Sequence, residues 1–286
     1  MILDYFKIAT GNLKGKKLRS WLTLLGIFIG IATVVALIGL GNGLKTAINS
    51  QFGISSTEVL AVQAGGMSNA GPPGTGVVKP LTTDDVKAIE KLTYVDYAVP
   101  RLVEILRVEF NKNTEVVYAV SMPDGEKRKF GEEIMDIEAE TGRLLKDGDS
   151  SKVVLGNNFA SNDNMFKKKI QSGDRLVMNG YTFEVVGIVK KKGSFIFDGA
   201  AYINEQKLRD ITGNKDRVAV IGVKVKSKEV ITQAKEEVEK LLRKRRDVKE
   251  GHEDFTVQTP EALLSSVNSI LTGVQIFIVL IAAISI

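Results

Sequence analysis

The sequence predicts a membrane protein in which an extracytoplasmic α/β (α+β) domain of two lobes stands between two transmembrane helices. Three observations predict this fold class: an uncharged run near each end, a cluster of cations before the first run, and alternating strand and helix patterns in between. The predicted organisation is a segment 1–19, a first span 20–44, an outer domain 45–259, and a stalk with a second span at 260–286.

The first uncharged run, residues 20–44, is long enough to cross a bilayer. As a helix it would extend about 37 Å, against roughly 30 Å of hydrocarbon. A secretory signal has an apolar region of about 7 to 15 residues followed by an A-x-A site, and no such site follows this run. An uncleaved spanning helix therefore fits better than a cleaved signal, and Trp21 stands where an interfacial ring is expected.

Two glycines inside the first span have the spacing of a helix-packing motif. Gly26 and Gly30 are four residues apart, and small residues at this spacing let helix backbones approach closely in lipid. Glycine is also common in spanning helices in general, so packing and mere tolerance of glycine both remain open.

The charges of residues 1–19 predict the orientation of the chain. This segment carries a net charge of +4, whereas the whole chain carries +5. The cations directly before the span are Lys14, Lys16, Lys17 and Arg19. By the positive-inside rule, the N-terminus lies in the cytoplasm, residues 45–259 lie outside, and the second span returns inward. The nearly neutral remainder lacks the basic footprint of a nucleic-acid-binding protein.

Residues 1–19 also have a loose apolar face. The pattern suits a short amphipathic helix lying in the cytoplasmic interface of the cell membrane, in contact with the lipid bilayer. The alternative is a solvated tail that happens to contain some apolar residues.

The second uncharged run, residues 262–286, has its own helix start signal. Thr259 can cap free backbone N–H groups, Pro260 fits the first helical position, and Glu261 suits the positive end of the helix dipole. A helix from Pro260 would be about 40 Å long, which leaves room for a short stalk outside the bilayer. No basic residue follows the run, so we expect the natural protein to continue past Ile286.

The outer domain alternates strand and helix patterns in a way that predicts a split lobe. A strand in residues 56–64, a helix that begins with Thr82 and Asp85 in capping-box spacing, and further strands come first. A strand near residues 217–226, a helix capped by Ser227 and a last strand repeat this order. We therefore predict one βαβ lobe from residues 45–115 and 204–259, with an inserted lobe at 116–203.

The inserted lobe contains a hairpin signal and two lysine triplets. Asn179-Gly180 separates the predicted strands Arg175–Met178 and Tyr181–Val189, and both of its positions accept positive φ. The triplets 167–169 and 190–192 either bind anionic headgroups or an acidic partner, or are simply solvated surface.

The sequence offers little for catalysis, and we predict no enzyme activity, cofactor or metal site in this chain. It has no cysteine and a single histidine, His252, so neither a Cys/His pair nor a His-rich zinc site can form. The nearest match to a phosphate loop, residues 11–17, has one residue too few between its glycines and no Ser or Thr after the lysine. The carboxylate pairs Asp84/Asp85 and Glu132/Glu133 suit helix starts and solvated faces.

The order of these segments resembles a known family. It combines a basic amphipathic lead, the run "LRSWLTLLGIFIGIATVVALIGLGNG", a split outer domain and the inner block "GR...VVLGNNFA...F...GD...NGYTFEVVGIV". In this order the chain is similar to permease subunits of the MacB-type ABC transporter family, whose relatives include the LolC/LolE and FtsX proteins. The resemblance implies that the inner block belongs to a MacB-like periplasmic core domain, and that three more spanning helices follow the outer domain. This sequence stops inside the second span.

The resemblance also implies a function, namely mechanotransmission by a dimer of permeases that each dock on a cytoplasmic ABC ATPase. ATP-driven closure would then move the outer domains for export or extraction of a substrate that the sequence does not identify. A membrane sensor or receptor with an outer α/β ligand-binding domain has the same two-span layout and remains an alternative. An anchored binding or assembly domain without any transport role is the third reading.

Overall fold

A computed structural model describes residues 58–65 and 77–259, together with scattered helical positions and short runs between 21 and 43 and between 262 and 276. The chain divides into two compact units, residues 47–263 and residues 1–46 with 264–286. Among the described residues, no helix combines the length and the apolar character needed to cross a membrane. About half of the predicted span 20–44 and most of the predicted segment 260–286 lie outside the described residues.

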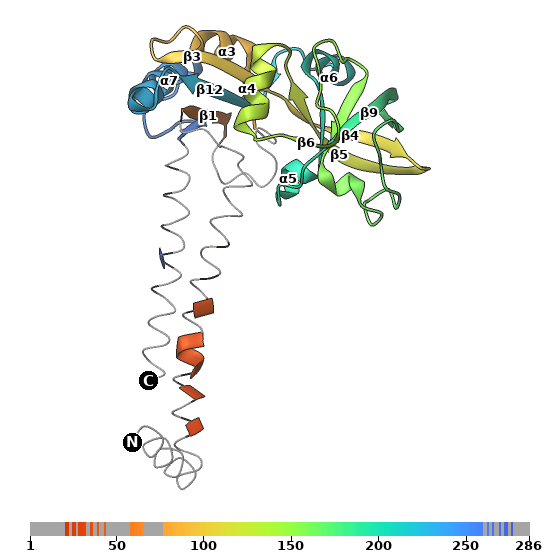
Figure 1. The fold of residues 1–286 in the computed structure, drawn as a ribbon. Helices are drawn as coiled ribbons and strands as arrows, with labels where there is room; N and C mark the ends of the chain where they lie inside the picture. Colours follow the sequence, from red (N-terminus) through yellow and green to blue (C-terminus); the bar gives the residue numbers. More distant parts are fainter. Residues whose placement is uncertain are drawn as a thin grey trace. The chain divides into compact units, whose positions relative to one another are not determined.

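The larger unit contains a four-stranded antiparallel sheet in the order β13-β1-β12-β3 (Figure 1). Its strands are β1 (Val59–Ala64), β3 (Val95–Arg101), β12 (Val220–Val225) and β13 (Phe255–Gln258). Helix α3 (Thr83–Ile89) precedes β3, and helix α7 (Ile231–Arg246) connects β12 to β13. The two βαβ units interleave, because β12 lies between β1 and β3 while β1 lies between β12 and β13. This is a split βαβ arrangement, and we call these four strands the split sheet.

Helices α3 and α7 cover one face of the split sheet. Alternate residues of its strands share a buried core with Val86 and Ile89 of α3 and with Ala234, Val238 and Leu242 of α7. This spacing of buried positions along α7 is that of an amphipathic helix.

The same unit contains a seven-stranded sheet that follows β3 in the chain. Its strands are β4 (Val103–Phe110), β5 (Asn113–Met122), β6 (Ala139–Gly142), β7 (Lys152–Leu155), β8 (Arg175–Met178), β9 (Tyr181–Val189) and β10 (Ala200–Asn204). Strand β8 pairs with both β4 and β9, so six strands close into a barrel in the order β9-β7-β10-β5-β4-β8. Strand β6 pairs with the far end of β9.

Alternation along the barrel strands separates an inner core from an outer one. Val153, Leu155, Ala201 and Ile203 face the inner core, whereas their neighbours Val154 and Tyr202 belong to the outer core. The outer core is completed by Met135, Ile137, Leu145 and Phe197, from segments that cover one side of the barrel.

Shorter elements complete the larger unit. They are β2 (Leu81–Thr82), α4 (Glu126–Ile134), η1 (Asn157–Ala160), α5 (Phe195–Asp198), α6 (Glu205–Thr212), β11 (Arg217–Val218) and η2 (Lys228–Val230). Strands β2 and β11 pair with each other in a small separate sheet.

Several sequence predictions are confirmed. Strands β8 and β9 have the predicted bounds. In the turn that joins them, Asn179 has a φ of 46° and Gly180 a φ of 85°. Thr82 and Asp85 form the predicted capping box at α3. Val59 of β1 is paired with Lys224 of β12, so the two predicted halves share one sheet.

Two predictions are wrong. The inserted lobe was expected at residues 116–203, but the seven-stranded sheet begins at Val103, and the predicted boundary falls inside β5. The reason is that β4 pairs along its whole length with β5, from Val103↔Val120 to Phe110↔Asn113. Ser227 makes no side-chain cap bond, because the 3-10 turn η2 separates it from the start of α7 at Ile231.

Candidate functional site: the joint between the split sheet and the barrel

The chain enters and leaves the split sheet along two neighbouring strands. Strand β1 is the first of the unit and β13 the last, and they pair antiparallel with Ala61 opposite Gln258. At the other end of the pair, Gly65 N donates to Asp254 O at 2.7 Å. The start of β1 and the end of β13 therefore lie at the same end of the sheet, next to the segments that continue toward residues 1–46 and 264–286.

The first joint between the split sheet and the barrel is the polypeptide backbone itself. Strand β3 ends at Arg101 and β4 begins at Val103, so only Leu102 separates them. Leu102 N donates to the buried Ser121 Oγ at 2.8 Å, and Ser121 N donates to Leu102 O at 2.9 Å. This pair of hydrogen bonds fixes the point at which the chain passes from one sheet to the other.

Two polar side chains accompany this crossing: Arg101 at the end of β3 and Tyr202 of β10. Burial lowers the pKa of the Arg101 guanidinium to about 10, and the Tyr202 hydroxyl acts against this shift. Burial raises the pKa of Tyr202, whose hydroxyl donates to Phe197 O at 3.2 Å. Both groups therefore keep their ordinary protonation states, Arg101 as a cation and Tyr202 as a neutral phenol, at neutral pH.

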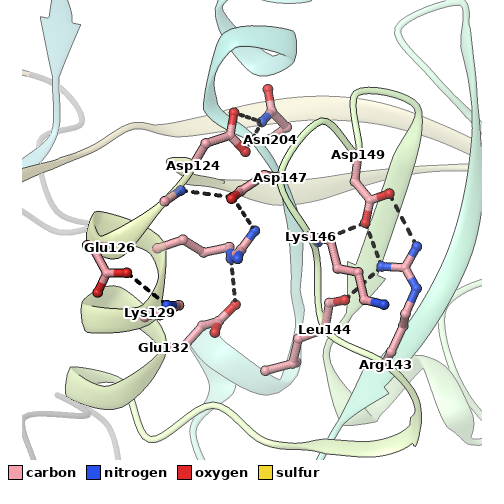
Figure 2. A network of polar contacts seen from close by, with 12 residues as sticks. Asp124, Glu126, Lys129, Glu132, Arg143, Leu144, Lys146, Asp147, Asp149 and Asn204 are labelled. Carbon is pink, nitrogen blue, oxygen red and sulfur yellow. Dashed lines mark hydrogen bonds and ion pairs between the residues drawn. The ribbon is translucent and has the colours of Figure 1, made fainter.

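Helix α4 is the second joint, and its N-terminal end is bonded to the barrel. Asp147 Oδ1 accepts from Gly125 N at 2.8 Å and from Arg128 Nη1 at 2.7 Å (Figure 2). Arg128 also lies 3.5 Å from Glu132, one turn further along the helix. Gly125 has a φ of 70°, a conformation that glycine adopts without strain.

The loop that carries Asp147 is itself held in place. Asp149 accepts from both terminal nitrogens of Arg143 and from Lys146 N (Figure 2). The hydrogen bond from Arg143 holds the pKa of Asp149 below its ordinary range. Just before α4, Asp124 accepts from Asn204 Nδ2 at 3.1 Å, while Asn204 Oδ1 caps α6.

The opposite face of α4 packs on the split sheet. Phe130 and Ile134 form a buried cluster with Val59 of β1 and Val99 of β3. The ring of Tyr97 contacts Phe130 edge to face, with centroids 4.6 Å apart. In the view of Figure 1, α4 lies between the split sheet and the barrel. One short helix thus makes polar bonds to the barrel and apolar contacts to the split sheet.

Electrostatic contacts support the same joint. Lys127 of α4 pairs with Glu90 at the end of α3, at 2.5 Å. Lys224 Nζ of β12 lies 5.5 Å from the ring centroid of Tyr97 and 5.6 Å from that of Phe130. Burial raises the pKa of Glu132, and the nearby Arg128 acts in the opposite direction.

The predicted site residues lie in the terminal segments. Trp21 is helical and 70% exposed, and Gly26 and Gly30 are helical as well. A Cβ at Gly30 would have no heavy atom within 4 Å, so its role in helix packing stays a prediction. Thr259 Oγ1 accepts from Ala262 N at 3.0 Å, which is N-cap geometry. Lys14, Lys16, Lys17, Arg19 and Pro260 lie outside the described residues.

The carboxylate pairs named from the sequence have structural contacts. Asp84 pairs with Lys87 at 3.1 Å, Asp85 closes the capping box and accepts from Arg245 at 2.7 Å, and Glu132 lies beside Arg128. Within residues 58–65 and 77–259, and at the single positions described outside them, no three His, Cys, Asp or Glu residues form a group that could hold a metal ion.

The α4 joint was missed in the sequence. Its signal is short: Gly125 followed by an Arg128/Glu132 pair and a Phe130/Ile134 pair, each four residues apart. That spacing places the ion pair and the apolar pair on two faces of one helix. A helix of this length is marginal by itself, and its packing against two sheets provides most of its stability.

Comparisons with known proteins give a consistent result. A model of the MacB-like periplasmic core domain family matches residues 20–241. An uncharacterized ABC transporter permease of Methanocaldococcus jannaschii is 31% identical over 99% of the chain and 68% of its own length. A macrolide export ATP-binding/permease protein, MacB, of Campylobacter fetus is 28% identical over 96% of the chain, which spans only 43% of that protein.

Two crystal structures share the fold. The periplasmic region of MacB from Actinobacillus actinomycetemcomitans matches with a TM-score of 0.56 and 16% identity, over 76% of this chain and 94% of that one. The extracellular domain of the noncanonic ABC-type transporter YknZ matches with a TM-score of 0.52 and 15% identity, over 70% and 100%. With the split sheet, the barrel and these relatives together, the chain belongs to the ABC transporter permeases that have a MacB-like periplasmic core domain.

Proposed function

We propose that this chain is the permease and mechanotransmission subunit of a MacB-type ABC transporter. In this proposal a separate cytoplasmic ATPase drives movement of the terminal helices, and the outer domain carries that movement to a substrate on the far side of the membrane. Two permease subunits act as a dimer, with their N-termini in the cytoplasm. The substrate class is left open.

The observation that carries the proposal is the pairing of β1 with β13. A displacement of either terminal segment acts on neighbouring strands of one sheet, because hydrogen bonds link Ala61–Ala64 to Phe255–Gln258. From the split sheet, the Leu102 crossing and helix α4 lead into the barrel. Packed cores transmit displacement because they have low compressibility. A simple anchor would need neither joint.

The Methanocaldococcus jannaschii relative is named only as a permease, and this name and the sequence support a separate source of ATP hydrolysis. The Campylobacter fetus relative is named as an ATP-binding and permease protein, and the chain covers less than half of it. The given sequence contains no phosphate loop with the required glycine spacing and following hydroxyl residue. The proposal therefore assigns ATP binding to a partner of this chain.

The proposal is tested with the full-length protein in nanodiscs, alone and with the ATPase encoded beside it. We expect no ATPase activity from the permease alone, a stable complex with the ATPase, and hydrolysis by that complex. Glycines at Ser265 and Ser266 loosen the predicted stalk, since each change from serine to glycine costs a helix roughly 0.5 kcal/mol. They should lower the ATPase rate of the complex without dissociating it.

The matched control places two glycines on the exposed face of α7, as Glu236→Gly with Lys240→Gly. These residues are outside the proposed path, so the ATPase rate should stay near that of the wild type. A protein that binds no ATPase and continues past Ile286 into a cytoplasmic signalling domain would be a receptor. An equal loss of rate in both glycine pairs would remove the argument for the stalk.

A further inference from the structure

Two lysines from distant segments of the barrel line one pocket. The pocket has a volume of about 650 Å³ and is bordered by η1 and the residues after it. Lys169 comes from the segment between η1 and β8, and Lys191 from the segment between β9 and α5. Each belongs to one of the two lysine triplets of the sequence, so the fold brings one member of each triplet to the same hollow.

The segment that carries Lys191 is fixed on both sides. The carboxylate of Asp198, only 3% exposed, accepts from Lys192 N and from Gly193 N, each at 2.8 Å. Lys190 forms an ion pair with Glu138, and Lys192 forms one with Asp136. Both flanking lysines thus have carboxylate partners, and the backbone of Lys191 is held in place between them.

The segment that carries Lys169 is fixed in a similar way. Asn164 Nδ2 donates to Phe159 O and to Lys168 O, each at 2.8 Å, and Ile170 N donates to Phe159 O at 3.0 Å. The ammonium group of Lys168 lies 5.7 Å from the ring centroid of Phe110. The neighbours of Lys169 therefore have protein contacts that keep its position in the pocket wall.

Lys169 and Lys191 differ from these neighbours, because in the described part of the chain neither ammonium group forms a hydrogen bond or ion pair. Two carboxylates also line the pocket, Glu140 and Asp163. Glu140 accepts from Asn157 Nδ2, and Asp163 is exposed. A bound anion would supply these two ammonium groups with the charged partner that the described protein groups do not provide.

We propose that this pocket binds the phosphate or carboxylate group of a small ligand through Lys169 and Lys191. Lysine binds phosphate as a point charge, so two ammonium groups suffice without the planar geometry of arginine. Side-chain amide and hydroxyl groups from Asn158 and Ser161 line the same pocket and can donate further hydrogen bonds. The anionic group comes either from a soluble molecule or from a lipid headgroup, which have this chemistry in common.

The first experiment measures binding of inorganic phosphate to the full-length chain in a non-ionic detergent, at constant ionic strength. We expect saturable binding to the wild type and at least roughly tenfold lower affinity after Lys169→Gln with Lys191→Gln, because both ammonium groups that bind the anion are removed. The control, Lys167→Gln with Lys244→Gln, removes the same charge from exposed lysines that do not line the pocket. It should leave the affinity unchanged.

The second experiment separates the two sources of the anion. Hydrogen exchange of residues 157–170 is compared in nanodiscs of phosphatidylcholine alone and of phosphatidylcholine with about a fifth phosphatidylglycerol. Protection by phosphatidylglycerol that the pocket variant abolishes assigns a lipid headgroup, and protection only by added phosphate assigns a soluble ligand. The proposal is overturned if neither anion protects the segment, or if both double variants lose phosphate affinity equally.

Discussion

Arg128 Nη1 lies 2.7 Å from Asp147 Oδ1, and this bond ties the helix that packs on the split sheet to a loop of the barrel. The Arg128 side chain is only 11% exposed, so its charge is largely removed from water. Asp147 also accepts from Gly125 N at the start of the helix. A single carboxylate therefore accepts hydrogen bonds from both the first turn of α4 and its largely buried arginine, and the position of α4 depends on it.

Replacing Asp147 should loosen α4 locally. In Asp147→Ala, the Gly125 N–H and the Arg128 guanidinium lose a common acceptor. The expected cost is about 1–1.5 kcal/mol, because Asp147 is 60% exposed and water replaces part of the lost bonding. We expect hydrogen exchange of residues 126–134 to become up to roughly tenfold faster, measured by mass spectrometry on the full-length chain. The control, Glu126→Ala, removes a pair whose Glu126 side chain is 85% exposed, and should have little effect. Equal exchange in both variants would contradict the role of Asp147.

Shortening Ile134 should weaken the contact between α4 and the split sheet. Ile134→Ala leaves a cavity beside Val59 and Val99, and such changes typically cost 2–5 kcal/mol. We expect a lower melting temperature of the full-length chain, faster hydrogen exchange in β1 and β3, and in the complex a lower ATPase rate. Ile134→Val should cost only about 0.5–1.5 kcal/mol. The matched control is Ile105→Ala on the exposed face of β4, which should change the melting temperature little.

Local signals in the sequence predicted much of the fold. The Asn179-Gly180 turn and the Thr82/Asp85 capping box each depend on neighbouring residues, so their geometry follows from the sequence directly. The pairing of β1 with β12 also followed, because both βαβ units had the same order of elements. These features required no knowledge of how distant segments pack.

The remaining features depend on contacts between distant segments. Strand β4 could not be assigned to the barrel from its own residues, since only Leu102 separates it from β3 and both strands have similar composition. Arg128 and Asp147 are 19 residues apart, and the sequence around neither residue indicates that the two form an ion pair. The convergence of Lys169 and Lys191 likewise depends on the barrel, whereas each triplet by itself resembled ordinary solvated surface.

The loop that holds Asp147 should lose stability in acid through Asp149. Its hydrogen bond from Arg143 lowers the pKa of Asp149 in the folded state, so the stabilisation is present above the ordinary pKa of about 4 and disappears as the pH falls through the lower folded value. Asp149→Asn should lower the melting temperature of the full-length chain at pH 7, and the difference from the wild type should shrink below about pH 4. A difference that stays constant from pH 7 to acid would show that the charge of Asp149 is not involved.

The orientation of the chain can be tested with single cysteines, because the sequence contains none. Lys240 is exposed on α7 of the outer domain, and Lys14 belongs to the cationic cluster before the first predicted span. If positive charge holds the N-terminus in the cytoplasm, a membrane-impermeant maleimide added to cells with an intact inner membrane should label Lys240→Cys, whereas Lys14→Cys should react only after lysis. A second outer-domain position, Lys112→Cys in the exposed turn between β4 and β5, should behave like Lys240→Cys. Labelling of Lys14→Cys with protection of both outer positions would reverse the orientation and, with it, exclude an ATPase docked on the N-terminal side.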